Sequence, residues 1–167
     1  GDRICITAGE EELAAFFKTI GAYTEPVGNV LITGGGRVTY YLESFLANSD
    51  ISSTVIERDK ALCYSLATQY DCTTICDNPT KQELLIGEGI KTTDAFLALS
   101  AVDEENAIVS MFAKTENVKK VITLISTLSY VDFFKSAGID SIVSPKSSMA
   151  SFVLRYARAM VTNADSE

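Results

Sequence analysis

The sequence predicts an α/β fold with a doubly wound parallel sheet of about six strands. From residue 29 onward, short β-branched runs alternate with helix-length stretches, as in successive βαβ units. A glycine-rich turn follows the first of these runs and opens the first helix-length stretch. At 167 residues, the chain is long enough for one core that buries roughly 70% of the surface of the unfolded chain. We therefore expect one Rossmann-like domain.

The strands are expected where apolar and β-branched residues cluster. The predicted strands are residues 30–33, 54–56, 73–76, 95–99, 120–125 and 141–144. The first helix should cover residues 37–47. Asp59 should cap a second helix that ends near residue 69. Thr80 and Glu83 have the spacing of a capping box, which predicts a helix that begins at Lys81.

The second half of the chain follows the same alternation. The acidic run at residues 103–105 suits the positive end of a helix dipole, and its simplest interpretation is a solvated helix start. Ser129 and Asp132 form another capping pattern, and Gly138 should end that helix. After Pro145, apolar residues recur at helical spacing over residues 147–161. A long amphipathic helix should therefore end the predicted structure.

The chain divides into three predicted parts. Residues 1–28 do not fit the alternation; Ile4 and Ile6 suggest a strand, followed by a helix closed by Gly21 and a linker. Residues 29–146 form the Rossmann-like domain. Residues 147–167 form the terminal helix and tail, whose apolar stripe either contacts another subunit or covers the sheet of its own domain.

Composition excludes several classes of function. The net charge of −8 and the lack of a basic stretch disfavour binding to nucleic acids. The longest apolar stretches fall short of the ~20 residues needed to cross a bilayer, and no leader is apparent, so a cytoplasmic location is expected. Without histidine and without paired cysteine motifs, no metal site is expected, and the four cysteines are interpreted as small buried apolar residues.

The turn after the first strand has the sequence GGGRVT, over residues 34–39. It matches the dinucleotide-binding fingerprint at its first two essential positions, Gly34 and Gly36, whereas Thr39 stands at the third. Gly34 would allow the tight turn, and Gly36 would let the backbone approach a pyrophosphate at the helix N-terminus. Thr39 adds volume where the helix packs on the sheet, so we expect a slightly wider spacing there.

An acidic residue follows the second strand, as nucleotide binding requires. Glu57 lies 57 − 36 = 21 residues after Gly36, where a carboxylate would bind ribose hydroxyls. This favours NAD over NADP, although Arg58 is also suited to a 2′-phosphate. Proteins that bind S-adenosylmethionine have a similar turn and acidic residue, so the motif does not exclude this ligand.

The sequence lacks the standard catalytic motifs. It has no histidine, no nucleophile elbow and no P-loop, and Phe134 occupies the position where a short-chain dehydrogenase would carry its lysine after Tyr130. We therefore expect no enzyme activity. The alternatives are an NAD-dependent oxidoreductase or a methyltransferase, and a degenerate scaffold unit that binds no nucleotide.

The ordered motifs resemble the regulator-of-potassium-conductance (RCK) domains of the regulatory subunits of Trk-type potassium uptake systems. The similarity runs from about residue 29 to 159. It is carried by NVLITGGGRVTYYL (29–42), TVIERD (54–59), AFLALSAVDEENAIVSMFAK (95–114), KKVITLIS (119–126) and YVDFFKSAGIDSIVSPK (130–146).

The resemblance implies a regulatory role beside a membrane potassium-transport subunit, on the cytoplasmic face of the membrane. It implies binding of NAD or NADH, or of ATP or ADP, without catalysis, and assembly into a homo-oligomer through the terminal helix. The segment CDNPT (76–80) departs from the family's loop after the third strand, but Asp77 is retained. The predicted binding residues are Gly34, Gly36, Arg37, Val38, Glu57, Arg58, Asp77 and Ser100.

Overall fold

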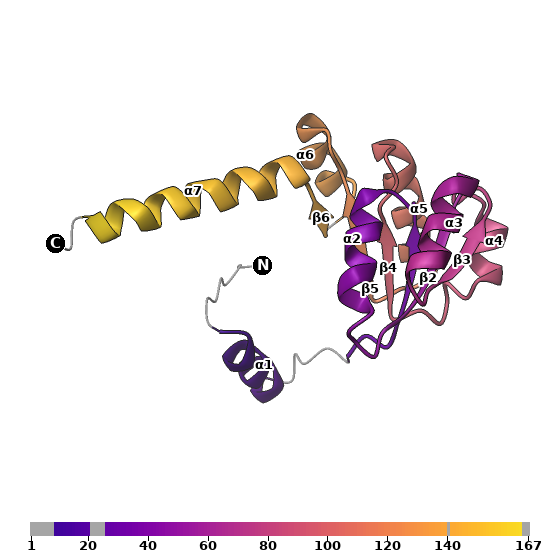
Figure 1. Ribbon diagram of the computed structural model, residues 1–167, viewed down its shortest axis with the longest axis horizontal. Coiled ribbons are helices and arrows are strands. Elements are labelled where there is room, and N and C mark those ends of the chain that lie inside the picture. The colour runs from indigo at the N-terminus through magenta and orange to yellow at the C-terminus, as the bar shows by residue number, and fades with distance from the viewer. Residues whose placement is uncertain (1–8, 21–25, 140, 165–167) are drawn as a thin grey trace.

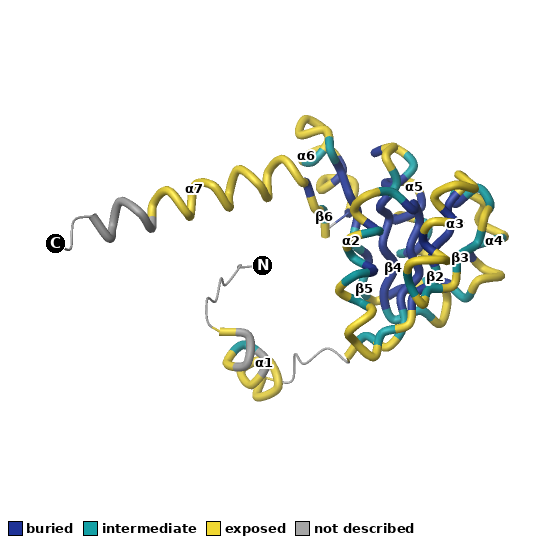
Figure 2. Tube along the Cα trace, in the orientation of Figure 1, coloured by how far each residue is buried: buried dark blue, intermediate teal, exposed yellow. Residues whose placement is uncertain are grey.

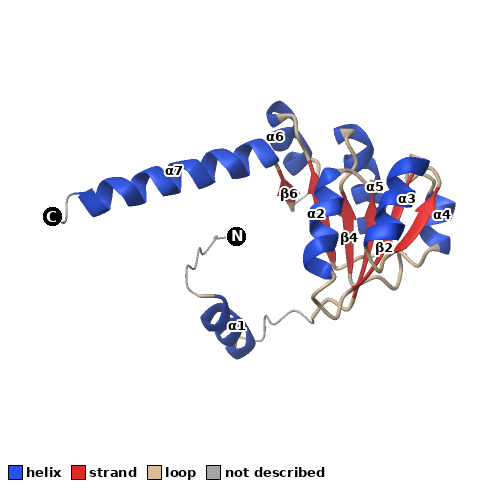
Figure 3. Ribbon diagram, in the orientation of Figure 1, coloured by secondary structure: helices blue, strands red, loops and turns tan. Residues whose placement is uncertain are grey.

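The predicted doubly wound sheet is confirmed in the computed structural model, which describes residues 9–20, 26–139 and 141–164. Six parallel strands lie in the order β3-β2-β1-β4-β5-β6, with helices on both faces (Figures 1 and 3). The strands are β1 (Asn29–Thr33), β2 (Ser52–Glu57), β3 (Thr73–Cys76), β4 (Ala95–Ala98), β5 (Lys120–Leu124) and β6 (Ile142–Val143). The helices are α1 (Glu10–Thr19), α2 (Arg37–Leu46), α3 (Lys60–Gln69), α4 (Gln82–Gly87), α5 (Asp103–Thr115), α6 (Leu128–Ser136) and α7 (Pro145–Ala164).

The strand order reverses direction between β1 and β4. The chain builds the sheet outward from β1 to β3 and then returns to place β4 on the other side of β1. Open α/β sheets bind ligands at the carboxyl ends of the strands beside such a switch point. The fold therefore places the glycine-rich turn, which directly follows β1, at the expected position for a ligand.

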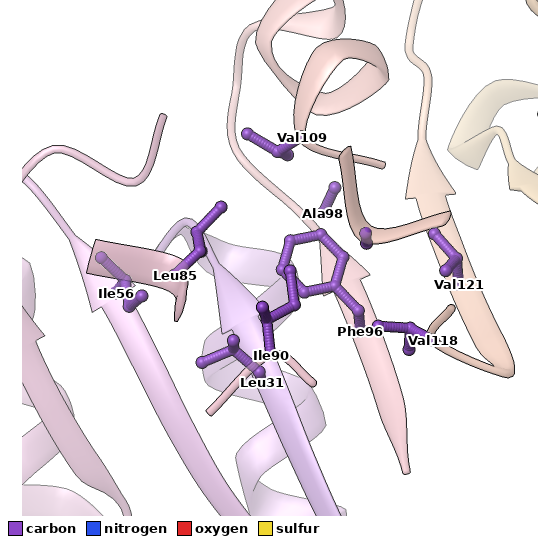
Figure 4. Packing of buried hydrophobic residues seen from close by; sticks show 10 residues of the cluster. Leu31, Ile56, Leu85, Ile90, Phe96, Ala98, Val109, Val118 and Val121 are labelled. Atoms are coloured by element: carbon purple, nitrogen blue, oxygen red, sulfur yellow. The ribbon is translucent and has the colours of Figure 1, made fainter. Parts of the chain in front are cut away.

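Both faces of the sheet are covered by apolar packing. On one face, Leu31, Ile56 and Phe96 pack with Leu85 and Val109, which come from α4 and α5 (Figure 4). A separate cluster of buried residues covers the opposite face, and Leu66 from α3 belongs to it. Its strand residues are Val30, Ile32, Val55, Ala95, Leu97 and Leu124. Successive residues of β1 thus point to opposite faces, as the pleat of a strand requires.

The Asp59 cap is confirmed, but the capping box at Thr80 is wrong. The Asp59 carboxylate accepts hydrogen bonds from the first N–H groups of α3. Helix α4 begins one residue later than predicted, after an N-cap at Lys81. The Thr80 N–H and hydroxyl instead donate to Asn78 Oδ1, at 3.0 and 2.9 Å. The Thr80 side chain, which a capping box requires at the helix N-terminus, is therefore already bonded within the turn at Asn78.

The second capping pattern, Ser129 with Asp132, is also wrong. Helix α6 begins at Leu128, with Thr127 at its N-cap, and Gly138 follows its end with φ +93°, as predicted. The turn before α6 is held by Asp103, whose carboxylate accepts from Ser126 N and Thr127 N, both at 2.8 Å.

The acidic run at the start of α5 is correspondingly less solvated than predicted. Asp103 is 7% exposed, and its pKa lies below the ordinary value because the hydrogen bonds from this turn outweigh the effect of its burial.

The cysteines are not all buried. Cys63 is buried and free, Cys72 is half-buried, and Cys76 is exposed. Cys76 ends β3, which lies at the edge of the sheet, so only one side of this strand is paired. Cys5 lies outside the described residues.

Two helices stand apart from the sheet. Helix α1 lies away from the domain, and α7 leaves it as one long helix whose described side chains are exposed (Figures 1 and 2). The predicted strand at Ile4 and Ile6, and the Gly21 stop, lie outside the described residues. On α7, exposure is 65% for Met149 and 60% for both Phe152 and Tyr156. The alternative that this stripe covers its own sheet is therefore wrong.

None of the helices in the described part of the chain is both long and apolar enough to cross a membrane.

Candidate nucleotide-binding site

Gly34 makes the turn from β1 possible. It has φ +96°, in the left-handed region, and its N–H donates to Ile56 O at 2.9 Å. A Cβ at this position would lie 2.5 Å from both Cα and N of Ser100, which are backbone atoms. The turn after β1 and the chain after β4 therefore approach each other as closely as a glycine allows, which confirms the predicted tight turn.

Gly35, which the sequence analysis passed over, connects the turn to β2. Its N–H donates to Glu57 Oε2 at 2.5 Å, and a Cβ there would lie 2.9 Å from Glu57 Cγ. The signal was present in the sequence as the middle residue of three consecutive glycines. This residue brings the acidic side chain and the glycine turn into direct contact.

Gly36 is the N-cap of α2 and has extended backbone angles, φ −73° and ψ −171°. A Cβ added here would meet nothing within 4 Å, so the fold itself does not demand glycine. In the described part of the chain, no side-chain hydrogen bond caps α2. The first N–H groups of the helix, including those of Arg37 and Val38, are therefore arranged as in sites that bind phosphates.

Thr39 fits inside the domain in place of the third glycine. It is fully buried, and its hydroxyl donates to the carbonyl oxygen of Gly34. This hydrogen bond satisfies the only polar atom of the side chain and links the first turn of α2 to the glycine turn. Thr39 thus supports the loop from within the domain.

Glu57 ends β2 and is only 9% exposed. Besides the bond from Gly35, its Oε1 accepts from Asp59 N at 2.8 Å. A carboxylate has about four acceptor positions, and these two bonds leave capacity for a ribose hydroxyl. Glu57 therefore braces the glycine turn and remains suited to its predicted role.

Arg58 is engaged with protein groups. Its Nη2 donates to Glu105 Oε2 at 2.7 Å and to Asn78 Oδ1 at 3.4 Å, while the side chain stays 52% exposed. The ion pair joins the end of β2 to the first turn of α5. Exposed pairs of this kind contribute at most about 1 kcal/mol, so a ligand phosphate can compete for the guanidinium.

Asp77 is engaged with protein groups through one of its carboxylate oxygens. Its Oδ1 accepts from Lys81 Nζ and from Asn78 N, both at 2.6 Å. The Lys81 ammonium, with the Asn78 N–H, holds the pKa of Asp77 below its ordinary value. Because Asp77 and Lys81 are only four residues apart, this contact is local.

Ser100 is positioned by Asn106, another residue that the sequence analysis missed. The Asn106 side chain accepts from Ser100 N and donates to Ser100 O and to Leu124 O, each at 2.9 Å. Asn106 is 1% exposed and lies among apolar positions of α5. A polar residue on the buried face of a predicted helix was the signal available in the sequence.

The structure thus brings Gly34, Gly36, Glu57 and Ser100 together at the carboxyl edge of β1, β2 and β4. Arg58 and Asp77 lie beside β2 and β3 and are bound to neighbouring side chains. No group of three or more acidic or cysteine side chains within the described residues is arranged to hold a metal ion.

This fold and this turn define a doubly wound, Rossmann-like domain. The comparisons with known proteins identify the family. The chain belongs to the TrkA-N domain family, whose model matches residues 30–145.

Relatives of this chain carry the name of a potassium uptake protein. The Trk system potassium uptake protein TrkA of Haemophilus influenzae is 31% identical over 159 residues, which is 95% of this chain and 34% of that protein. A TrkA homolog of Methanothermobacter thermautotrophicus is 32% identical over 124 residues, 74% of this chain and 57% of that protein. The chain therefore spans between a third and somewhat more than half of the length of these relatives.

Solved structures support the fold. The TrkA-N domain of the Escherichia coli inner membrane protein ybaL has a TM-score of 0.69 at 18% identity, and the match covers 80% of this chain and 98% of that one. The GsuK channel bound to NAD has a TM-score of 0.60 at 19% identity, over 78% of this chain and 25% of that one. The Shewanella denitrificans Kef C-terminal domain in its AMP-bound form has a TM-score of 0.64 at 15% identity, and the match covers 80% of this chain and 81% of that one.

Proposed function

We propose that this chain is a regulatory nucleotide-binding domain of a potassium uptake system. Its partner is a membrane potassium-transport subunit, on whose cytoplasmic side it lies. Membership of the TrkA-N family and relatives named as potassium uptake proteins support this assignment. The single observation that carries ligand binding is the uncapped N-terminus of α2 at Gly36, placed beside the braced carboxylate of Glu57.

The proposed ligand is NAD or NADH, with ATP or ADP as the alternative. All four share an adenosine phosphate, which suits a helix N-terminus next to an acidic residue that binds ribose. The NAD-bound and AMP-bound structures with the same fold hold ligands that contain this unit. Glu57 favours a ribose with a free 2′-hydroxyl, so NADP is disfavoured.

A scaffold unit without nucleotide is the second candidate. Two of the predicted binding residues are already paired within the chain, Asp77 with Lys81 and Arg58 with Glu105. In this case the domain would keep its assembly role and lose the ligand.

Assembly through α7 belongs to the same proposal. The stripe formed by Met149, Phe152, Val153 and Tyr156 is at least 55% exposed at every member. Apolar surface of this kind is stabilised when a second copy covers it, which favours a homo-oligomer.

Calorimetry with NAD, NADH, ATP and ADP tests ligand binding. We expect at least one of them to bind more tightly than about 1 mM, near −4 kcal/mol. Glu57→Ala should weaken that ligand, whereas the exposed Glu83→Ala on α4 should not. If none of the four binds, the scaffold candidate replaces the nucleotide site.

We also propose that the domain has no turnover of its own. The bound nucleotide should be recovered unchanged after long incubation, as measured by chromatography. Conversion of many equivalents of NADH or ATP, in proportion to the amount of pure protein, would restore the oxidoreductase or another enzyme as the better assignment.

A further inference from the structure

A cavity lies at the opposite end of the sheet from the glycine turn. It has a volume of about 290 Å³ and lies between the end of α2, the start of β2 and the turn after α3. Its lining includes Glu43 and Leu46 from α2, Ser53 from β2, and Tyr70 with Asp71 from the α3–β3 turn. Because nucleotides bind at the carboxyl ends of the strands, this cavity at the amino end of β2 is a separate site.

Glu43 is the unusual residue of this cavity. It lies one helical turn after Thr39 on the side of α2 that faces the sheet, and it is only 2% exposed. Its Oε2 accepts a hydrogen bond from the Ser53 hydroxyl at 2.8 Å. Its Oε1 is buried and has no hydrogen-bond partner in the described part of the chain. Burial raises the pKa of Glu43, against the opposing effect of the Ser53 hydroxyl.

A buried carboxylate with one unpartnered oxygen is unfavourable unless a cation or a donor reaches it. The Ser53 hydroxyl supplies a donor to Glu43 Oε2, but Oε1 has neither a donor nor a cation among the described residues. The ten residues that line the cavity are all described, and none of them is basic. Asp50 and Asp71 add two more carboxylates at its exposed rim, and the remaining polar side chains are hydroxyls. The lining thus offers acceptors and attracts positive charge.

The rest of the lining suits the stem of an organic cation. Leu46 and Ile51 contribute half-buried apolar surface, and the ring of Tyr70, held against Tyr40 at 5.1 Å between centroids, stands at the wall. An aromatic ring attracts cations, and an alkyl stem packs on apolar side chains. The cavity therefore combines a deep anionic group, acidic residues at the rim and an apolar wall.

We propose that this cavity binds a primary alkylammonium cation, whose N–H groups bond to Glu43 and whose stem lies against Leu46 and Ile51. The ammonium supplies three donors for Glu43 and for the hydroxyl and carboxylate oxygens of the lining. This inference does not rest on the proposed function, because it uses none of the residues of the glycine turn.

Calorimetry with butylammonium chloride tests the proposal, with tetramethylammonium chloride to hold the ionic strength constant. We expect saturable binding to the wild-type chain and a loss of at least about tenfold in affinity for Glu43→Gln, which keeps the shape and removes the charge. Asp71→Asn, at an exposed position, should weaken binding by a smaller factor. Glu83→Gln on α4 is the matched control and should bind like the wild type.

Two further measurements keep the test decisive. In the wild-type protein labelled with 13C at glutamate carboxyl groups, butylammonium should shift the Glu43 resonance, which is identified by its loss in the Glu43→Gln spectrum. Butan-1-ol, which has a stem but no charge, should not compete. Equal binding to wild type and Glu43→Gln would overturn the proposal. So would binding of Mg²⁺ or Ca²⁺ that depends on Glu43 when butylammonium does not bind.

Discussion

The two outer glycines of the turn after β1 differ in what the fold demands of them. At Gly34, alanine would have to adopt a left-handed backbone and place its Cβ 2.5 Å from the Ser100 backbone. The strain costs about 1–3 kcal/mol and the overlap about 1–3 kcal/mol more. For a domain of this size, the Gly34→Ala variant should therefore melt on the order of 10 °C lower.

At Gly36, the same substitution should leave stability nearly unchanged. A Cβ there meets nothing within 4 Å, and the backbone angles suit any residue. Alanine is a poorer N-cap than glycine by about 0.5–1 kcal/mol, but it lowers the entropy of the unfolded chain by a similar amount. The melting temperature should stay within about 3 °C of the wild type. Nucleotide affinity should nevertheless fall at least about tenfold, because the methyl group stands where the phosphate approaches.

Thermal unfolding followed by circular dichroism and calorimetry with NADH measure the two effects separately. A Gly36→Ala variant that keeps full affinity would show that no phosphate approaches this residue. If Gly34→Ala has the same melting temperature as the wild type, the close contact with Ser100 is wrong. The stability comparison remains informative even where no nucleotide binds.

Three other predictions concern stability and assembly. The raised pKa of Glu43 means that the folded state retains a proton that the unfolded state loses. Stability should therefore fall as the pH rises from the ordinary carboxyl pKa through the raised one. Urea unfolding measured over this pH range should show that Glu43→Gln removes the slope and is more stable than the wild type above the raised pKa. Asp103→Ala leaves two backbone N–H groups before α6 without their acceptor, so urea unfolding should show a loss of about 2–4 kcal/mol. Phe152→Glu combined with Tyr156→Lys should give a folded monomer, since both side chains are exposed on the single chain. The melting temperature of this variant should not depend on protein concentration, whereas that of an oligomeric wild type should. Sedimentation that matches an oligomeric wild type would contradict the α7 interface.

The order of strands and helices could be predicted from the sequence because it depends on local patterns. Runs such as residues 30–33 alternate with helix-length stretches, and Asp59 and Gly138 act on their own neighbours along the chain. The glycine turn was likewise recognisable from its spacing to Glu57. These features need only short-range geometry.

The tertiary structure alone decided which polar groups meet. Thr80 and Ser129 had the sequence pattern of helix caps. In the structure, Thr80 instead donates to Asn78, and the turn before α6 is held by Asp103, which comes from α5. Burial of Glu43 depends on α2 packing against β2, which no residue count along the chain reveals.

The terminal helix and the glycine turn show the same difference between what local sequence patterns determine and what tertiary packing decides. The sequence determined that residues after Pro145 form an amphipathic helix, since helical periodicity is local. Whether that helix covers its own sheet depends on the direction in which it leaves β6, and the structure directs it outward. In the same way, the sequence determined the glycine turn, but only the parallel register of β1, β2 and β4 brought Gly34, Glu57 and Ser100 to one edge, because contacts between distant residues are set by packing.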